Sequence, residues 1–362
     1  MKVGILTHYD VLNQGAQLQM YAMYHQLLDM GHTPVILSYQ KNFDFEMEEK
    51  LKNHITIKSV PYILVNYLWK KGIGLTWHNV KKYIVSYRFR KKEFEMQSYD
   101  KEKLDAIIIG SDEVFSIPVG INKVMFGYNL PTDRIIAYAP SFGQTDMERI
   151  RKYNCEEIMR TGLKKFTYLS ARDEHTKNLI SELSGQKAER VCDPAILYDF
   201  SNIHNKFKKP RYKYMVVYSY DRHMNEPEYV EIIKKIAREK ELVVISPGTY
   251  HKWCDKNVVC DALQWLEWIR NAEFVITDTF HGTIASFIMQ TPMAVFVRNK
   301  INVNKLQDLV KSLKIENRVL AKFSYNNLQY LMEQEMEFKQ LFEETDKIRK
   351  KGCEYLESAL RS

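Results

Sequence analysis

Residues 277–283 read T-D-T-F-H-G-T and combine a predicted helix start with a glycine and a histidine. They lie between a predicted strand over 274–276 and a predicted helix over 284–289. The free N–H groups and partial positive charge of a helix start favour an anionic ligand, and Gly282 lets that ligand approach the backbone. His281 can give or take a proton near neutral pH. The alternative is structural: Asp278 or Thr279 only caps the helix.

Arg172 is a second candidate, because it follows a predicted strand over 168–171 and precedes a predicted helix. Its guanidinium can hold a phosphate or a carboxylate through two parallel hydrogen bonds. The alternative is a surface arginine paired with Asp173 or Glu174.

Two series of apolar strands alternating with helices would position these residues. The first predicted series covers 2–7, 34–37, 105–109, 135–139 and 168–171, and the second covers 214–218, 242–245, 274–277 and 294–297. A polar stretch over 199–211 separates them. We therefore predict an α/β protein with two doubly wound Rossmann-like domains facing a cleft, over 1–200 and 201–324. A helical tail over 325–362 would follow and cross back to the first domain.

Six short motifs occur in an order that resembles the polysaccharide pyruvyl transferase family over residues 1 to about 320. The N-terminal motif is G-I-L-T at 4–7 with N-x-G-A-x-L-Q-x-Y-A at 13–22, and I-G-S-D follows at 109–112. The others are A-Y-A with S-F-G at 137–143, S-A-R-D at 170–173, C-D-P at 192–194, and the segment 277–283.

The resemblance implies a fold like the B-type glycosyltransferases (GT-B) and a reaction of phosphoenolpyruvate with a sugar. The enolpyruvyl unit moves onto two sugar hydroxyls, giving a cyclic ketal and inorganic phosphate. His281 matches the family's catalytic histidine, Arg172 matches an arginine that binds phosphoenolpyruvate, and we expect Asp112 to orient the acceptor hydroxyls. The implied substrate-binding residues are Asn13, Gly15, Gly110, Ser111, Asp278, Thr279, Phe280, Gly282 and Thr283.

The expected chemistry needs no metal and no cofactor other than phosphoenolpyruvate as co-substrate. Charged His281 would protonate the methylene carbon of phosphoenolpyruvate. Arg172 and the N–H groups of Gly282 and Thr283 would hold its phosphate and carboxylate. Asp278 would orient His281 or cap the helix.

The sequence departs from the family at two positions. Many members have arginine two residues before the histidine, where this chain has Thr279, so a second cation would come from elsewhere, such as Arg298 or Lys300. Phe115 stands where many relatives have tryptophan after the Gly-Ser-Asp turn.

Two other functions stay open from the sequence alone. One is a GT-B glycosyltransferase that uses a nucleotide sugar, in which Asp261 or Glu267 would bind the ribose. The other is a binding protein that kept the fold without activity, which the absence of arginine at position 279 leaves open.

The length of 362 residues fits two domains, and the 45% of hydrophobic residues excludes a disordered chain. The net charge of +8 comes from residues 51–92, which hold 10 basic residues, no acidic residue and seven aromatic rings. This mixture suits an anionic membrane surface. A solvated helical face is the alternative. Binding to nucleic acid is disfavoured, because the rest of the chain has no basic stripe.

Five cysteines without a C-x-x-C pair favour a reduced compartment rather than disulfides or zinc. We see no signal peptide and no apolar stretch long enough to span a bilayer. We therefore expect a cytoplasmic enzyme, peripheral to the inner face of the membrane. Its acceptor would be a surface-polysaccharide (capsule or exopolysaccharide) sugar carried on a polyprenyl diphosphate.

Overall fold

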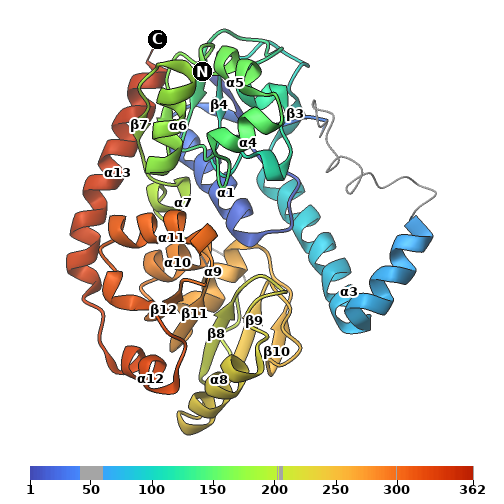
Figure 1. Cartoon of the computed structure of the whole chain (residues 1–362), viewed down its shortest axis with the longest axis vertical. Helices are drawn as coiled ribbons and strands as arrows, with labels where there is room; N and C mark the ends of the chain where they lie inside the picture. Colours follow the sequence, from blue (N-terminus) through green and yellow to red (C-terminus); the bar gives the residue numbers. More distant parts are fainter. Residues whose placement is uncertain (41–59, 202, 204–206, 299, 362) are drawn as a thin grey trace.

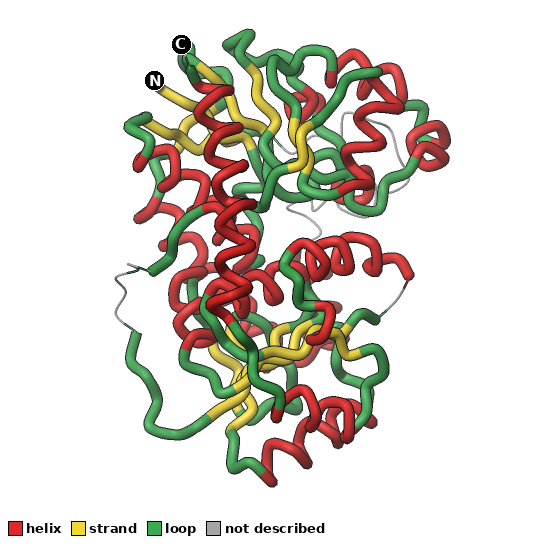
Figure 2. The backbone as a smooth tube through the Cα atoms, turned by 90° about the vertical axis from the view of Figure 1, so that its left-hand side faces the viewer, coloured by secondary structure: helices red, strands yellow, loops and turns green. Residues whose placement is uncertain are grey.

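Two parallel sheets organise the protein, whose computed structural model describes residues 1–40, 60–201, 203, 207–298 and 300–361. Figure 2 shows them as two groups of strands, one in each half of the molecule. The first sheet has the order β3 (Met96–Ser98), β2 (Thr33–Ser38), β1 (Lys2–Leu6), β4 (Ala106–Ile109), β5 (Ile135–Ala137). The second has the order β10 (Lys256–Val258), β9 (Val243–Pro247), β8 (Tyr214–Tyr218), β11 (Phe274–Thr277), β12 (Met293–Phe296), β13 (Val319–Leu320). A small third sheet pairs β6 (Ser170–Ala171) with β7 (Glu189–Arg190).

The central strands are apolar on both faces because helices cover both faces of each sheet. The helices of the first half are α1 (Gln14–Asp29), α3 (Val60–Glu93), α4 (Met147–Lys152), α5 (Glu156–Leu163), α6 (Glu174–Ser184) and α7 (Pro194–Leu197). Those of the second are α8 (Pro227–Glu239), α9 (Ala262–Arg270), α10 (Phe280–Ile288), α11 (Lys300–Ser312), α12 (Tyr325–Glu333) and α13 (Phe338–Leu360). This arrangement confirms the predicted α/β class with parallel sheets.

The strand register brings the loops that carry the site to one edge of each sheet. Leu6 of β1 pairs with Ile109 of β4, so both strands end at the same level. The Thr7 hydroxyl then donates to the carbonyl oxygen of Ser111 at 3.1 Å. In the second sheet, Tyr218 at the end of β8 pairs with Thr277 at the end of β11.

Helices α1, α7, α9 and α10 pack against one another between the two sheets. One apolar cluster, which includes Leu18 of α1, Trp265 of α9 and Phe287 of α10, runs through both halves. The carboxyl-terminal edges of the two sheets therefore face each other across a closely packed contact.

Helix α13 runs along one side of the molecule from the second half back to the first (Figure 1). There the Tyr355 hydroxyl donates to the carbonyl oxygen of Ala137 at 2.9 Å, and the Arg134 guanidinium donates to that of Ala359. We keep the domain limits at residues 200 and 324 as a prediction.

Candidate active site

His281 lies in the first turn of α10, which begins at Phe280. The expectation that this helix begins at residue 284 is wrong, because the Thr279 hydroxyl caps it by accepting from the Gly282 N–H at 3.0 Å. The Thr283 N–H also bonds inside this turn, to the carbonyl oxygen of Thr279 at 3.1 Å. The predicted use of these two N–H groups for an anion is therefore wrong. A helix start leaves its first amides, here those of Phe280 and His281, without intrahelical partners.

Gly282 and Thr283 belong to the packing of α10 rather than to a ligand surface. A Cβ atom at position 282 would lie 2.2 Å from the Thr277 hydroxyl oxygen, so only glycine fits between helix and strand. Thr283 is fully buried, and its hydroxyl donates to the carbonyl oxygen of Thr279 at 2.9 Å.

Asp278 neither orients His281 nor caps α10, so both expectations for it are wrong. Its two carboxylate oxygens accept from the Ser219 hydroxyl at 2.6 Å and from Nδ1 of His223 at 2.9 Å. Arg298 lies 3.8 Å from the same carboxylate and forms an ion pair with Glu226. Arg298 is thus already held by two carboxylates in the second half.

Asp193 is the carboxylate that stands beside His281. It caps α7 and is fully buried, and its Oδ2 lies 3.6 Å from Nε2 of His281 and 3.1 Å from Nη1 of Arg172. Burial would raise the pKa of Asp193, but His281 and Arg172 outweigh it and hold the pKa well below its ordinary value. Asp193 is therefore a buried anion placed directly beside the His281 ring and the Arg172 guanidinium.

The Arg172 side chain is 2% exposed and lies at the centre of the site. The alternative pairing with its neighbours is wrong, since Asp173 caps α6 and Glu174 pairs with Lys177. Its guanidinium lies 4.4 Å from the centre of the Phe280 ring, and its Nε and Nη2 have no hydrogen-bond partner. Buried guanidinium donors without partners are costly, so they favour an anionic ligand at this position.

The turn after β4 supplies the third group, Asp112, whose Oδ1 lies 3.8 Å from Nη1 of Arg172. Burial opposes ionisation of Asp112, yet nearby Arg172 and His281 lower its pKa overall. Gly110 has φ +121° and a Cβ there would lie 2.2 Å from the Tyr138 carbonyl oxygen. The Ser111 hydroxyl donates to the carbonyl oxygen of Ala139 and lies 3.3 Å from Asp193.

The start of α1 meets the start of α10 directly. Asn13 caps α1, its side chain accepting from the N–H groups of Gly15 and Ala16 at 2.8 and 3.2 Å. A Cβ atom at Gly15 would lie 2.3 Å from Cβ and Cγ of His281. Gly15 therefore lets the His281 side chain pass against the backbone of α1.

Replacing Gly15 with alanine should displace the His281 ring. Alanine favours a helix over glycine by about 0.5–1 kcal/mol, so α1 itself would not be weakened. A misplacement of about 1 Å can cost about 10²-fold in rate. We therefore expect Gly15→Ala to lower the rate of a reaction in which His281 transfers a proton by that order. Steady-state kinetics measure this, and thermal unfolding shows whether the variant is folded. Turnover equal to wild type would contradict the contact.

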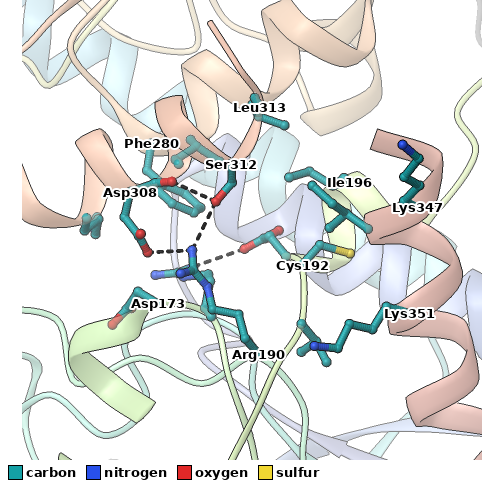
Figure 3. A pocket seen from close by; sticks show the side chains of 16 residues that line it. Asp173, Arg190, Cys192, Ile196, Phe280, Asp308, Ser312, Leu313, Lys347 and Lys351 are labelled. Carbon is teal, nitrogen blue, oxygen red and sulfur yellow. Dashed lines mark hydrogen bonds and ion pairs between the residues drawn. The ribbon is translucent and has the colours of Figure 1, made fainter. Parts of the chain in front are cut away.

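Two cavities adjoin the site. One, of about 330 Å³, is lined by Arg172, Asp193 and Phe280, and α11 and α13 close it with apolar side chains such as Leu309 and Ile348. Figure 3 shows Arg190 at this cavity with its guanidinium toward Asp308 and Ser312. The second, of about 350 Å³, lies between the halves and is lined by Asn13, Gln14, Asn79, Lys82, Tyr218, Asp221 and Thr279, among others.

Sequence reasoning missed three charged groups of the site. Asp193 lies in the C-D-P motif, where an aspartate before proline suggests only a helix cap. Glu113 and Lys305 form an ion pair that links the Gly-Ser-Asp turn to α11, and Lys305 Nζ lies 5.6 Å from the centre of the Phe280 ring. No local pattern marks Lys305, because its neighbours in the site come from three other segments.

Asp261 and Glu267 do not provide the ribose-binding acid expected of a nucleotide-sugar enzyme. The Asp261 side chain caps α9 in a capping box with Gln264, and Glu267 pairs with Arg270 at 2.6 Å. Among the described residues no group of three or more His, Cys, Asp or Glu side chains could hold a metal ion.

The comparisons with known proteins give a family and a fold. A family model of polysaccharide pyruvyl transferases matches residues 13–300, and a search of curated proteins found no match. The chain is similar to Methanocaldococcus jannaschii UDP-GlcNAc 2-epimerase in complex with UDP-GlcNAc and UDP, at 12% identity over 92% of this chain and 94% of that chain, with TM-score 0.50. It is also similar to Arabidopsis thaliana UGT89C1 complexed with UDP, at 10% identity over 98% of each chain, with TM-score 0.50. Identities this low show the fold alone, which is GT-B as predicted.

The family match includes Asp112, Arg172, Asp193 and His281 but not Lys305. Within that match, Arg172, Asp193 and His281 come from motifs distant in sequence and meet at one point. The chain therefore belongs to the polysaccharide pyruvyl transferase family.

Proposed function

We propose that this protein transfers the enolpyruvyl unit of phosphoenolpyruvate to two hydroxyls of a sugar, forming a pyruvate ketal and releasing phosphate. The observation that carries the proposal is buried Arg172, with two donor nitrogens unpaired, next to the His281–Asp193 pair. An arginine with unpaired donors suits an anion, and a histidine beside a buried carboxylate suits proton donation.

Phosphoenolpyruvate carries two anionic groups, and two cations converge where we place it. Arg172 and Lys305 both stand near the Phe280 ring, at 4.4 and 5.6 Å from its centre, and both line the cavity of about 330 Å³. Lys305 would take the part of the second cation that the sequence suggested for Arg298. Both side chains have carboxylate partners, but Lys305 lines the cavity that contains Arg172, and Arg298 does not. Lys300 is the other expectation, and its side chain lies outside the described part of the structure.

Proton transfer would begin with His281. The protonated imidazole gives its proton to the methylene carbon of phosphoenolpyruvate, which becomes a methyl group while C2 becomes electrophilic. One sugar hydroxyl attacks C2, the C2–O bond to phosphate breaks, and the second hydroxyl closes the ring. Of the two hydroxyl protons, one leaves on phosphate and the other restores His281. Asp193 would stabilise the imidazolium, and Asp112 would hold the acceptor hydroxyls.

The acceptor side would be the first half, with Asn13, Gly15 and the Gly-Ser-Asp turn at the cleft. We propose a sugar of a capsule or exopolysaccharide pathway, carried on a polyprenyl diphosphate at the inner face of the membrane. Incubation with phosphoenolpyruvate and lipid-linked sugars tests the reaction. The expected product gains the mass of pyruvic acid less one water, with one phosphate released per product. Transfer from a UDP-sugar without use of phosphoenolpyruvate would support the nucleotide-sugar alternative. The absence of product with every acceptor would support the alternative of a binding protein without activity.

Replacing Lys305 with alanine should weaken phosphoenolpyruvate binding. Losing one charge-assisted hydrogen bond costs about 1.5–3 kcal/mol, so we expect KM for phosphoenolpyruvate to rise by about 10–150-fold. Lys305→Arg keeps the charge and should retain most of the affinity. Lys311→Ala, an exposed lysine on the same helix, is the matched control. A KM unchanged in Lys305→Ala would remove Lys305 from the donor site.

A further inference from the structure

The outer face of the second part of α3 carries large apolar side chains into solvent. The helix bends at Gly72, and beyond the bend it stands at the side of the molecule away from α13 (Figure 1). Six side chains on this face are between 41 and 79% exposed: Ile73, Trp77, Val80, Tyr83, Ile84 and Tyr87. Five of them, at 73, 77, 80, 84 and 87, alternate steps of four and three residues and so form one stripe along the helix.

The inner face of the same helix holds three buried polar side chains together with the apolar Phe89, which packs in the core. His78 is buried against the Tyr250 ring, with ring centres 5.5 Å apart, and burial lowers its pKa to about 4. Ser86 is buried, and Arg90 is buried and pairs with Asp10 at 3.1 Å. A helix facing water normally shows its polar side and hides its apolar side. The exposed apolar stripe, on a helix that buries His78, Ser86 and Arg90, indicates that something other than water covers the outer face.

The charges on this face have one sign. Lys81, Arg88, Lys91 and Lys92 are exposed, and no acidic residue occurs between 51 and 92. Lys81 Nζ lies 5.2 Å from the centre of the Trp77 ring, so cation and ring lie side by side. Aromatic rings beside cations match the headgroup region of an anionic bilayer, where rings enter the interface and cations meet phosphates.

We propose that the outer face of α3, residues 73–92, docks on an anionic lipid surface. A second copy of the chain would bring the same lysines and arginines toward one another, which like-charge repulsion opposes. The proposal is docking on the lipid surface and does not include insertion across the bilayer. No helix among the described residues is long and apolar enough to cross a membrane. Apolar area plus complementary charge therefore favours a lipid surface as the occupant. The proposal does not depend on the reaction assigned above.

Docking in this way would place the cavity of about 350 Å³ between the two halves near the membrane. Asn79 and Lys82, on the inner side of the same helical segment, line the cavity that also contains Asn13 and Thr279. If the proposed lipid-linked acceptor is right, its sugar would reach the cleft from the surface on which α3 lies.

Co-sedimentation with vesicles tests the docking with the full chain. Vesicles of phosphatidylcholine containing phosphatidylglycerol should bind the wild type, and vesicles of phosphatidylcholine alone should bind much less. Each Lys or Arg near an anionic surface contributes about fivefold to partitioning, so Lys81→Glu/Arg88→Glu should weaken binding at least about 25-fold. Trp77→Ser/Ile84→Ser should weaken binding to both vesicle types by removing the apolar part.

Matched controls carry the same changes elsewhere on the surface. Lys322→Glu/Lys339→Glu alters the charge equally, and Tyr330→Ser removes a side chain that is 60% exposed on α12. Both should bind like wild type, and thermal unfolding should be the same for all variants. Equal binding to both vesicle types, or none to either, would overturn the proposal. A wild-type dimer that Trp77→Ser/Ile84→Ser turns into a monomer would overturn it too, and assign the face to a second copy.

Discussion

His281→Ala should abolish phosphate release from phosphoenolpyruvate. A positioned general acid contributes about 10²–10⁴-fold to a rate, and here the acid gives the proton that makes C2 reactive. Arg172 and Lys305 remain in this variant, so binding of phosphoenolpyruvate should change little. Phosphate release in the presence of the acceptor measures the first effect, and calorimetric titration with phosphoenolpyruvate measures the second.

The matched control for this variant is His223→Ala, which removes a histidine bound to a carboxylate in the same half. His223 bonds to Asp278, away from Asp193, so its loss should leave phosphate release largely intact. Normal activity of His281→Ala would refute the proposed acid. Lost binding together with lost activity would instead give His281 a role in holding the donor.

Asp193→Ala should have the largest effect on stability. Removing one partner of a buried ion pair costs about 3–5 kcal/mol, because the charge left behind is buried and unpaired. Here that charge is Arg172, whose remaining carboxylate, Asp112, lies 3.8 Å away. We expect the free energy of unfolding, measured with urea, to fall by about this amount.

Asp346→Ala is the control, since it breaks an ion pair with Arg349 in which the aspartate is 68% exposed. Exposed pairs contribute about 0–1 kcal/mol, so a loss as large as that of Asp193→Ala would contradict the reasoning. The pH dependence gives a second check. The folded-state pKa of Asp193 is lowered, so its contribution is complete above the ordinary value of 3.8 and is lost as pH falls below it. Wild type and Asp193→Asn should therefore converge in stability in acid.

The sequence predicted which segments meet, but not which atoms face each other. Motifs after parallel strands had to share one edge, and Arg172, Asp112 and His281 do come together there. Asp278 adjoins Thr279, yet its carboxylate turns toward Ser219 and His223. That direction depends on neighbours from distant segments, which spacing along the chain does not reveal.

Short elements and reversed faces also lay beyond prediction from the sequence. The edge strands β3, β10 and β13 have two or three residues, too few for a periodic pattern. In α3 apolar side chains such as Trp77 and Ile84 are exposed while the polar His78, Ser86 and Arg90 are buried, so periodicity alone points to the wrong face. The mixture of basic and aromatic residues was visible in the sequence, whereas its exposure required the structure.

The route of the chain between its halves determines how they can move apart. It crosses once after α7 and once into α13, and Nε of Arg349 in α13 donates to the carbonyl oxygen of Ile196 in α7 at 2.6 Å. Helix α3 stands on the side of the molecule opposite to α13 (Figure 1). On that side, Gly74 of α3 lies against Tyr250 of the second half, a noncovalent contact. Because α13 connects the two halves covalently on one side, we expect a rotation that separates the sheets to pivot near α13 and to open widest beside α3.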